Sequence, residues 1–405
     1  MPCRDWRTAD AGELWHRDPV IDARASLEAV IRHATDLEDD YDDIEPALTA
    51  LAESGDRTLV PLLEAALARF LDDGNFYGRD LIAGVLAGIE GPSALPVLLR
   101  ASARDLRDDQ DSLGSEIIGL LQTDRAVGRT TAREFAALDA PELRRVGLWA
   151  LGFVVEPGDL DVLAPAMADP DPRIRSLVIG SVPLPEGFDV LLVGLRDVDE
   201  GVRTSAVSRL GYSGRVVAVA PLAGLVTDPA PRVRAMVAFG LGRLADESAG
   251  PVLLRLVEDP DRHVRECAVQ ALGRVGGSAT VDALLAMASD PEPHRRIEAA
   301  KALGAAAAAD SRAADALEML AADDIPAVRA ATISGIASTM KPSALGEHLV
   351  IRLTDDPDPS VRQRVAVLAR HLAPNRLESI VRRYVDDPDP NVRRIAETEL
   401  SRLPR

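Results

Sequence analysis

The sequence has 405 residues, of which 47% are hydrophobic and only 3% are aromatic, and its formal net charge is −19. A compact domain of this length usually divides in two and uses more large aromatic side chains, so this composition favours thin layers of small helices. The negative charge argues against a nucleic-acid partner, because phosphate binding needs a cationic surface. It favours a basic protein as the partner.

The amino-terminal segment, residues 1–20, carries Asp, Glu and Arg throughout and lacks an apolar core of signal-peptide length. No stretch of the sequence reaches the roughly 18 uncharged apolar residues of a membrane-spanning helix. Two cysteines, Cys3 and Cys267, are too few for a disulfide framework or a cysteine-rich zinc site. We therefore expect a cytoplasmic protein that does not bind membranes.

Residues 21–137 are expected to form degenerate helical repeats, and they contain three acidic stretches, Asp36–Asp43, Asp72–Asp80 and Asp105–Ser112. Aligned on the regular repeat of the following region, each stretch precedes the first helix of its own repeat. Corresponding turns lie side by side along one edge of a solenoid, so we expect the three stretches to form one acidic ridge. Departures from a regular scaffold are where function is expected.

This ridge supplies the candidate residues for partner binding. Aromatic residues in an acidic turn are unusual in a chain with so few of them, and such rings often anchor interfaces. The candidates are Tyr41, Phe76, Tyr77, Arg79, Asp80, Asp108, Asp109 and Asp111. An alternative stays open, in which the acids are solvated helix caps and the rings turn inward to cover the first repeats. A metal site is a weaker alternative, because solvated acidic runs are far commoner than carboxylate cages.

Residues 138–405 are expected to form regular repeats, because one phrase recurs in them: Asp-Pro-Asp-Pro, any residue, Val and Arg, with some substitutions. Its copies begin 28 to 33 residues apart, a spacing too regular for chance. With degenerate copies upstream, the chain would hold about a dozen repeats. The clear and looser copies are Asp169–Arg175, Asp197–Arg203, Asp228–Arg234, Asp259–Arg265, Asp290–Arg296, Asp323–Arg329, Asp356–Arg362 and Asp387–Arg393.

The phrase itself predicts the start of a helix. Its second Asp, such as Asp358, can accept hydrogen bonds from the free amides of the first turn. Pro359 then occupies the first helical position, where no donor is lost. Apolar residues follow with the period of a half-buried helix, and a Gly and a second apolar stretch complete a hairpin. At the carboxyl end, Asn391–Arg405 supplies one helix that we expect to cap the core.

Paired helices with a turn Asp and an Arg six residues later resemble HEAT repeats, in the bacterial subfamily first described in phycobilisome lyases. The resemblance implies an all-α protein, a right-handed α-solenoid (superhelix) of HEAT-type helical hairpins. It also implies a hydrogen-bonded ladder of these residues between adjacent repeats. We expect the ladder to set the register of the repeats, because an exposed ion pair contributes only about 0–1 kcal/mol. The ladder residues are Asp169, Arg175, Asp228, Arg234, Asp259, Arg265, Asp356, Arg362, Asp387 and Arg393.

The sequence contains only weak matches to known catalytic motifs. Gly240–Ala245 matches a loose dinucleotide fingerprint, but it lies inside a predicted helix with no strand before it. Some HEAT proteins are di-iron hydroxylases with His-Glu metal pairs, whereas none of the six histidines here precedes a Glu. Cys267 lies on the apolar face of its helix, which favours a small buried thiol. We therefore predict no catalytic, cofactor-binding or metal-binding residues.

These observations predict a non-catalytic scaffold or adaptor that binds a protein, through the acidic ridge or through a concave face lined by the second helices of the hairpins. The pattern Gly78-Arg79-Asp80 and Asp108–Asp111 also resembles uncharacterised actinobacterial HEAT proteins, some of which are suspected of neutralising polymorphic toxins. That resemblance implies an immunity-type binder of a basic partner. The alternative is a metal- or cofactor-dependent enzyme, lyase-like or hydroxylase-like, that uses the acidic amino-terminal loops.

Overall fold

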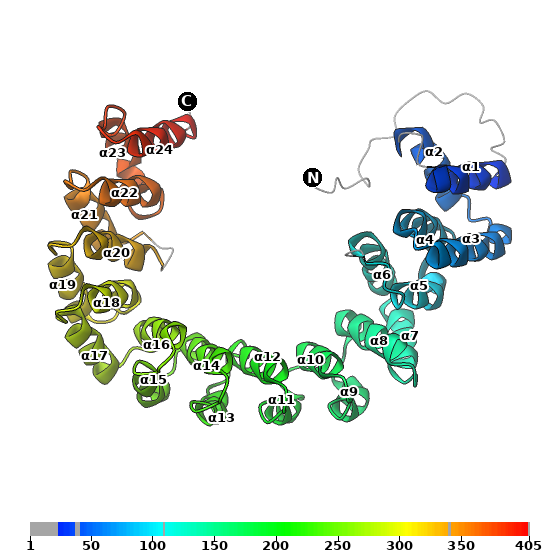
Figure 1. Ribbon diagram of the computed structural model, residues 1–405, viewed down its shortest axis with the longest axis horizontal. Helices are drawn as coiled ribbons and strands as arrows, with labels where there is room; N and C mark the ends of the chain where they lie inside the picture. Colours follow the sequence, from blue (N-terminus) through cyan, green and yellow to red (C-terminus); the bar gives the residue numbers. More distant parts are fainter. Residues whose placement is uncertain (1–22, 37–40, 108–109, 339–341, 404–405) are drawn as a thin grey trace. The chain divides into compact units, whose positions relative to one another are not determined.

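The computed structural model describes residues 23–36, 41–107, 110–338 and 342–403. Within these ranges every regular element is a helix, and the chain divides into two compact units, Met1–Ala166 and Met167–Arg405. The expected all-α architecture of helical hairpins is confirmed in each unit (Figure 1). The sequence boundary between residues 137 and 138 marks the start of the regular phrase, and it stays a prediction.

Unit 1 stacks its even-numbered helices in order, α2 on α4, α4 on α6 and α6 on α8. Each of these helices also packs against the odd-numbered helix that precedes it. The helices are α1 (Ala23–Asp36), α2 (Tyr41–Glu53), α3 (Val60–Asp73), α4 (Phe76–Glu90), α5 (Leu95–Ser102), α6 (Asp111–Thr123), α7 (Arg125–Ala136), α8 (Pro141–Val154) and α9 (Leu160–Ala166), with short 3-10 turns η1 (Arg57–Leu59), η2 (Gly91–Ala94) and η3 (Pro157–Asp159).

One apolar stretch of unit 1, Phe76–Ser102, has the length and the mean hydropathy, 1.6, of a membrane-spanning helix. In the structure it is divided into α4 and α5, because Gly91 adopts a positive φ of 57° between them. Half of its most apolar window is buried inside the protein. The stretch therefore serves as the core of two stacked repeats in this structure.

Unit 2 also stacks its even-numbered helices, each of which directly follows one copy of the recurrent phrase. They are α10 (Pro172–Ser181), α12 (Glu200–Gly211), α14 (Pro231–Leu244), α16 (Arg262–Val275), α18 (Pro293–Ala306), α20 (Pro326–Ala337), α22 (Pro359–Leu372) and α24 (Pro390–Ser401). Between them run α11 (Phe188–Gly194), α13 (Val219–Ala223), α15 (Gly250–Leu256), α17 (Ser278–Ala288), α19 (Ser311–Leu320), α21 (Ala344–Leu353) and α23 (Leu377–Arg383), with η4 (Val216–Ala218), η5 (Glu247–Ala249) and η6 (Pro374–Arg376).

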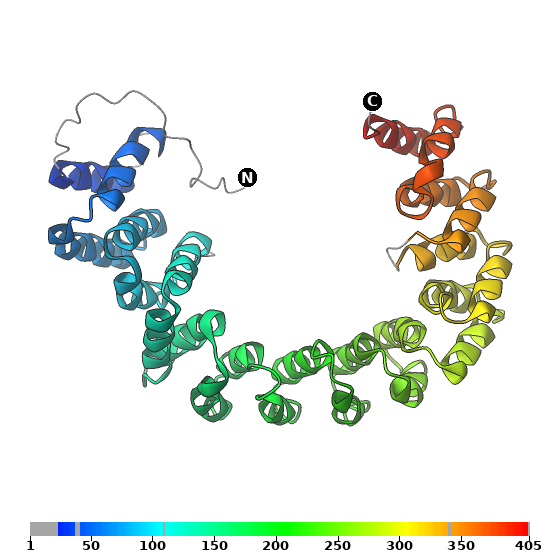
Figure 2. The same cartoon turned by 180° about the vertical axis from the view of Figure 1, so that it is seen from behind.

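The curvature of unit 2 corrects one expectation. From α12 to α20, the even-numbered helices lie on the inner side of the arc and the odd-numbered helices lie on its outer side (Figures 1 and 2). The concave face is thus lined by the first helix of each hairpin, not by the second. The first helices are the longer ones and pack continuously on one another, which leaves the shorter second helices to cover them from outside.

The predicted helix starts are confirmed at the clear copies of the phrase. Asp171, Asp261, Asp358 and Asp389 are N-cap residues whose side chains accept hydrogen bonds from amides of the first turn. These bonds satisfy amide donors that have no partner within the helix. Among the looser copies, Asp199 caps α12 in the same way, whereas the N-caps of α14, α18 and α20 lack such a side-chain bond. A Pro still occupies the first turn of these three helices. The fixed φ of Pro favours the helix there.

Candidate partner-binding surface

Three of the predicted binding residues occupy equivalent positions in unit 1. Tyr41, Phe76 and Asp111 are the first residues of α2, α4 and α6, which stack in that order. Tyr41 is 47% exposed and Phe76 is 51% exposed. These two rings do not turn inward, so the alternative of buried rings does not describe them. Asp108 and Asp109 lie outside the residues that the structure describes.

Tyr77 and Arg79 turn inward instead. The Tyr77 hydroxyl lies 2.9 Å from Nε2 of His33 on α1, a residue that is only 4% exposed. Arg79 has no exposed surface, and its Nη2 lies 2.7 Å from Oδ1 of the half-buried Asp80. The prediction that Arg79 contacts a partner is therefore wrong. Its position, one helical turn before Ala83, places it on the face of α4 that packs against other helices.

The acidic side chains near these rings differ in how their charge is compensated. Asp72 forms an ion pair with Arg104 at 3.1 Å, and Asp73 forms one with Arg69 at 3.5 Å. All four side chains are more than half exposed, so these pairs add little stability. They do reduce the negative potential around the start of α4.

The start of α2, in contrast, carries three exposed carboxylates that make no ion pair in the described part of the chain: Asp42 and Asp43 in the first turn, and Glu45 after it. Burial of the ring, followed by the charges of Glu45 and Asp42, raises the pKa of Tyr41. Its hydroxyl therefore stays protonated and can donate a hydrogen bond. We call Tyr41, Asp42, Asp43, Glu45 and Phe76 the acidic edge.

Sequence reasoning placed Asp42 and Asp43 in an acidic stretch without distinguishing them from Asp72 and Asp73. The local sequence separates these pairs only in part, because Arg69 precedes Asp73 by four residues in α3, whereas Arg104 comes from the turn after α5. The useful signal would have been the absence of any Arg or Lys between residues 33 and 56.

Most of the phrase arginines make two kinds of hydrogen bond, and those that do are Arg175, Arg203, Arg234, Arg296, Arg329 and Arg362. Nη1 of Arg234 donates to the backbone carbonyl of Asp228, six residues earlier, at 2.7 Å. Its Nε and Nη2 donate to the carboxylate of Asp259, in the next phrase, at 2.7 and 2.8 Å. Each Arg is thereby tied to its own turn and to the next one. The same ion pairs join Arg175–Asp197, Arg203–Asp228, Arg296–Asp323, Arg329–Asp356 and Arg362–Asp387.

Two carboxylates of the ladder, those of Asp259 and Asp387, are held in their ionised form. Hydrogen bonds from Arg234 lower the pKa of Asp259, and those from Arg362 lower the pKa of Asp387, against the opposing effect of burial. Each carboxylate also accepts the amide of the residue two positions on, at 2.9 Å. With all their strong acceptor positions occupied, these residues have a structural role and no free group for chemistry.

One ion pair of the ladder, between Arg265 and Asp290, is not formed in the described part of the chain, and we call this position the open rung. Nη1 of Arg265 donates to the carbonyls of Asp259 and Pro260, at 2.7 and 3.0 Å, but Arg265 makes no ion pair with Asp290 within the described ranges. Asp290 keeps its role in the turn, where it accepts the amide of Glu292 at 2.8 Å. The phrase contains both residues, so the sequence alone does not show that this rung is open.

No candidate catalytic centre emerges from the described residues. Among them, no group of three or more His, Cys, Asp and Glu side chains is placed to hold a metal ion. Cys267 is half-buried rather than fully buried, and burial raises the pKa of its thiol, with smaller effects from Glu266 and Asp261. A raised pKa lowers the fraction of the reactive thiolate. The loose dinucleotide fingerprint lies within α14, not in a loop after a strand.

The comparisons with known proteins agree with this repeat geometry. Two overlapping segments, residues 219–304 and 255–337, match the family model for HEAT repeats. These residues are HEAT repeats. The hairpins before and after them in unit 2 share their phrase and their ladder. No curated protein matches the sequence.

Solved structures with a similar fold are also HEAT-type solenoids. Kap121p has 16% identity and a TM-score of 0.50 over 94% of this chain, and importin β has 16% identity and a TM-score of 0.53 over 93%. The chain spans about half the length of Kap121p, 49%, and 62% of importin β. The CpcE–CpcF phycocyanin lyase of Nostoc, at 17% identity, has a TM-score of only 0.34 over 68% of this chain and 94% of its own.

Proposed function

We propose that this HEAT-repeat chain is a non-catalytic scaffold that binds a basic protein through the acidic edge of unit 1. The observation that carries the proposal is the uneven charge of the two units. Unit 1 has 16 basic and 32 acidic residues, a net charge of −16, whereas unit 2 has 30 basic and 33 acidic residues, a net charge of −3. Nearly all the net negative charge of the chain thus belongs to unit 1.

The acidic edge combines the two contributions that a specific interface needs. Asp42, Asp43 and Glu45 make no ion pair with any described residue, so their field extends to an approaching basic protein and speeds its association. The exposed rings of Tyr41 and Phe76 offer apolar area that can be buried against the partner and slow its dissociation. Rings on adjacent stacked helices can be covered together by one partner surface.

Two further observations support a binding role of this class. Two solved structures of similar fold contain Kap121p bound to Nup53p and to the SUMO protease Ulp1p, so solenoids of this fold bind proteins. The negative potential of unit 1 would suit a basic toxin, as in an immunity-type binder, and would repel nucleic acid. We include a cytoplasmic location in this proposal. No specific observation favours the enzyme alternative, which rests on carboxylates that the structure shows as surface charges.

The experiment compares partner capture by the intact protein and by charge variants. The variant Asp42→Asn/Asp43→Asn should retain less of a basic partner from a lysate of the native host, with the loss largest at low salt because the steering is electrostatic. The matched control is Asp189→Asn/Asp315→Asn, which removes the same charge from exposed positions on α11 and α19 that make no ion pair in the described residues. Captured proteins are identified and quantified by mass spectrometry.

A second variant separates anchoring from steering. Phe76→Ala should speed dissociation of the captured partner with little change in its association rate, measured by surface plasmon resonance. The proposal fails if the captured proteins are not basic, or if the control variant loses as much partner as the acidic-edge variant. Unchanged melting temperatures would show that lost binding does not come from unfolding.

A further inference from the structure

A second surface, on the inner side of unit 2, has the opposite charge. The ladder Arg gives the register of each inner helix, and the residues five and nine positions after it are exposed or half-buried. From α12 to α18 the fifth positions are Ser208, Phe239, Gln270 and Lys301, and the ninth positions are Tyr212, Arg243, Arg274 and Ala305. Because consecutive inner helices pack on one another, equivalent positions form two neighbouring rows.

The aromatic end of these rows is an organised cluster. Tyr212 is 56% exposed, and its ring lies 6.0 Å from that of Phe239 on the next helix, centroid to centroid. The guanidinium carbon of Arg243 lies 4.6 Å from the centroid of Tyr212, within the range of a cation–π contact. This contact holds the Arg243 charge beside the ring. Unit 2 contains only four aromatic residues, Phe188, Tyr212, Phe239 and Tyr384, and two of them are in this cluster.

The cations of the rows are not neutralised. Arg243, Arg274 and Lys301 are all exposed, and none of them makes an ion pair in the described part of the chain. The nearby Arg262 is compensated by Glu266, at 2.8 Å. The three cations come from consecutive inner helices of a chain whose net charge is −19. We call Tyr212, Phe239, Arg243, Arg274 and Lys301 the cationic strip.

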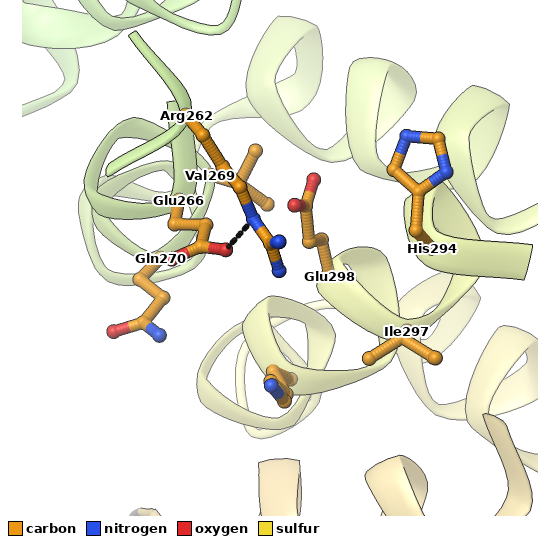
Figure 3. Close-up of a pocket in the computed structure, with 8 residues that line it drawn as sticks. Arg262, Glu266, Val269, Gln270, His294, Ile297 and Glu298 are labelled. Carbon is orange, nitrogen blue, oxygen red and sulfur yellow. Dashed lines mark hydrogen bonds and ion pairs between the residues drawn. The ribbon is translucent and has the colours of Figure 1, made fainter. Parts of the chain in front are cut away.

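The strip ends in a hollow between α16 and α18. The hollow has a volume of about 160 Å³, and its lining includes the apolar side chains of Val269 and Ile297 as well as Lys301 (Figure 3). Glu298 extends into it toward Arg262, and Glu298 makes no ion pair in the described residues. The hollow can therefore take a small apolar side chain beside the cations. It lies at the same junction as the open rung of the ladder.

We propose that the cationic strip binds an extended acidic segment of a partner protein, with a carboxylate at every third residue. Packed helices lie about 8–10 Å apart, so Arg243 and Arg274, at equivalent positions of α14 and α16, lie at approximately that spacing, and Lys301 follows on α18 one helical turn out of their row. A polyproline II segment has three residues per turn and rises about 3.1 Å per residue, so every third side chain returns to one face after about 9 Å. Consecutive carboxylates on that face meet consecutive cations, and the Tyr212 ring offers a surface for the intervening residues.

This inference is independent of the acidic edge, because it concerns other residues and a partner of opposite charge. Single-stranded nucleic acid also carries regularly spaced negative charge. The charge of the whole chain disfavours it, since a polyanion must approach a strongly acidic protein. A protein segment with a few carboxylates experiences that repulsion far less.

The probe is a fluorescein-labelled peptide of repeated Pro-Pro-Glu, and its control is a peptide of the same composition with the Glu residues gathered at one end. Fluorescence anisotropy with the full chain should show about tenfold tighter binding of the repeated peptide. Arg243→Gln/Arg274→Gln should weaken that binding about tenfold, and Arg243→Lys/Arg274→Lys should retain most of it. The matched control, Arg196→Gln/Arg255→Gln, removes two exposed arginines without ion pairs from the outer side and should leave the affinity unchanged.

Three outcomes would overturn the proposal. The first is equal affinity for the two peptides, which would mean that charge alone, without spacing, decides binding. The second is an equal loss in the control variant. The third is tighter binding of a single-stranded oligonucleotide than of the repeated peptide at the same ionic strength. Thermal melting by circular dichroism on each variant excludes unfolding as the cause of a lost signal.

Discussion

At the scale of single residues, the ladder arginines differ in what compensates their charge. The side chains of Arg234 and Asp259 are 10% and 6% exposed, and they form a bidentate ion pair. Arg265 keeps only its bonds to backbone carbonyls. Removing one partner of a buried ion pair leaves the other charge uncompensated. Removing a donor from a carbonyl near the surface costs much less.

We therefore expect Arg234→Ala to lower the free energy of unfolding by about 3 kcal/mol, because it leaves Asp259 buried without a cation. Arg265→Ala should lower it by only about 1 kcal/mol. Urea unfolding followed by circular dichroism measures both values. The control is Arg234→Lys, which keeps the charge but loses the bidentate geometry. Its loss in the free energy of unfolding should lie between the losses of the two alanine variants. Equal losses for the two alanine variants would contradict a structural role for the carboxylate pairing.

The same ion pairs make stability depend on pH. Hydrogen bonds from Arg234 hold the pKa of Asp259 below its unfolded value of about 3.9, so the folded state favours the ionised carboxylate. That contribution is fully present above the unfolded pKa and is lost as the pH falls through the folded pKa. Stability of the wild-type protein should be nearly constant from pH 7 to about 5 and fall below about pH 4. Arg234→Ala should make this fall shallower, as measured by urea midpoints across the pH range, and an unchanged slope would argue against the assignment.

The sequence identified the residues whose role depends on neighbouring positions in the chain. It did not identify those whose role depends on contacts between repeats. The N-cap role of Asp261 follows from its neighbours in the phrase, and the structure confirms it. The open rung at Arg265 depends on the distance between two repeats, which no local pattern encodes. Arg79 was misassigned for the same reason, because an Arg in an acidic stretch looks exposed until the helix phase is known. The cationic strip was missed because its members lie about 31 residues apart in the chain.

At the scale of helices, small residues determine how closely the inner helices of unit 2 approach. The residue eight positions after the ladder Arg is a Gly in four consecutive inner helices, Gly211, Gly242, Gly273 and Gly304. A Cβ added at Gly242 would lie 2.8 Å from the Cβ of Ala271, and one added at Gly273 would overlap the carbonyl of Ala302. This close approach explains why the chain uses so few aromatic residues. The layers are too thin to hold large rings.

We expect Gly273→Ala to destabilise the protein by about 1–3 kcal/mol, because the added methyl group must push α16 and α18 apart. Gly180→Ala is the matched control, since a Cβ added there, also in an inner helix, would meet no atom within 4 Å. It should be neutral or stabilise by up to about 1 kcal/mol through higher helix propensity. Thermal melting of both variants measures the difference. A similar change for both would show that helix propensity, and not close packing, governs these positions.

At the scale of the whole molecule, the repeats were predictable and the distribution of function over them was not. The spacing of the phrase is a property of the sequence alone, so the hairpins and their order followed from it. The candidate surfaces depend on which charges are compensated by residues from other repeats. Asp72 with Arg104 and Arg234 with Asp259 are such pairs, and Asp42, Arg243 and Lys301 lack them in the described residues. The two proposed binding surfaces therefore lie where this pairing between repeats is absent among the described residues.

The unequal charge of the two units predicts unequal responses to salt within one chain. Unit 1, with a net charge of −16, is destabilised by self-repulsion at low ionic strength, and salt screens this repulsion over distances of about 10 Å or more. Unit 2 is nearly balanced, and its ladder pairs are largely buried, so screening changes them little. Hydrogen exchange of the intact protein, read by mass spectrometry, should show slower exchange in α2–α6 when salt is raised, with little change in α12–α16.

The acid-to-amide variant Asp42→Asn/Asp43→Asn should reduce this salt effect in α2, whereas Asp189→Asn/Asp315→Asn should not. An equal salt response in both units would mean that local charge does not govern the stability of the acidic edge.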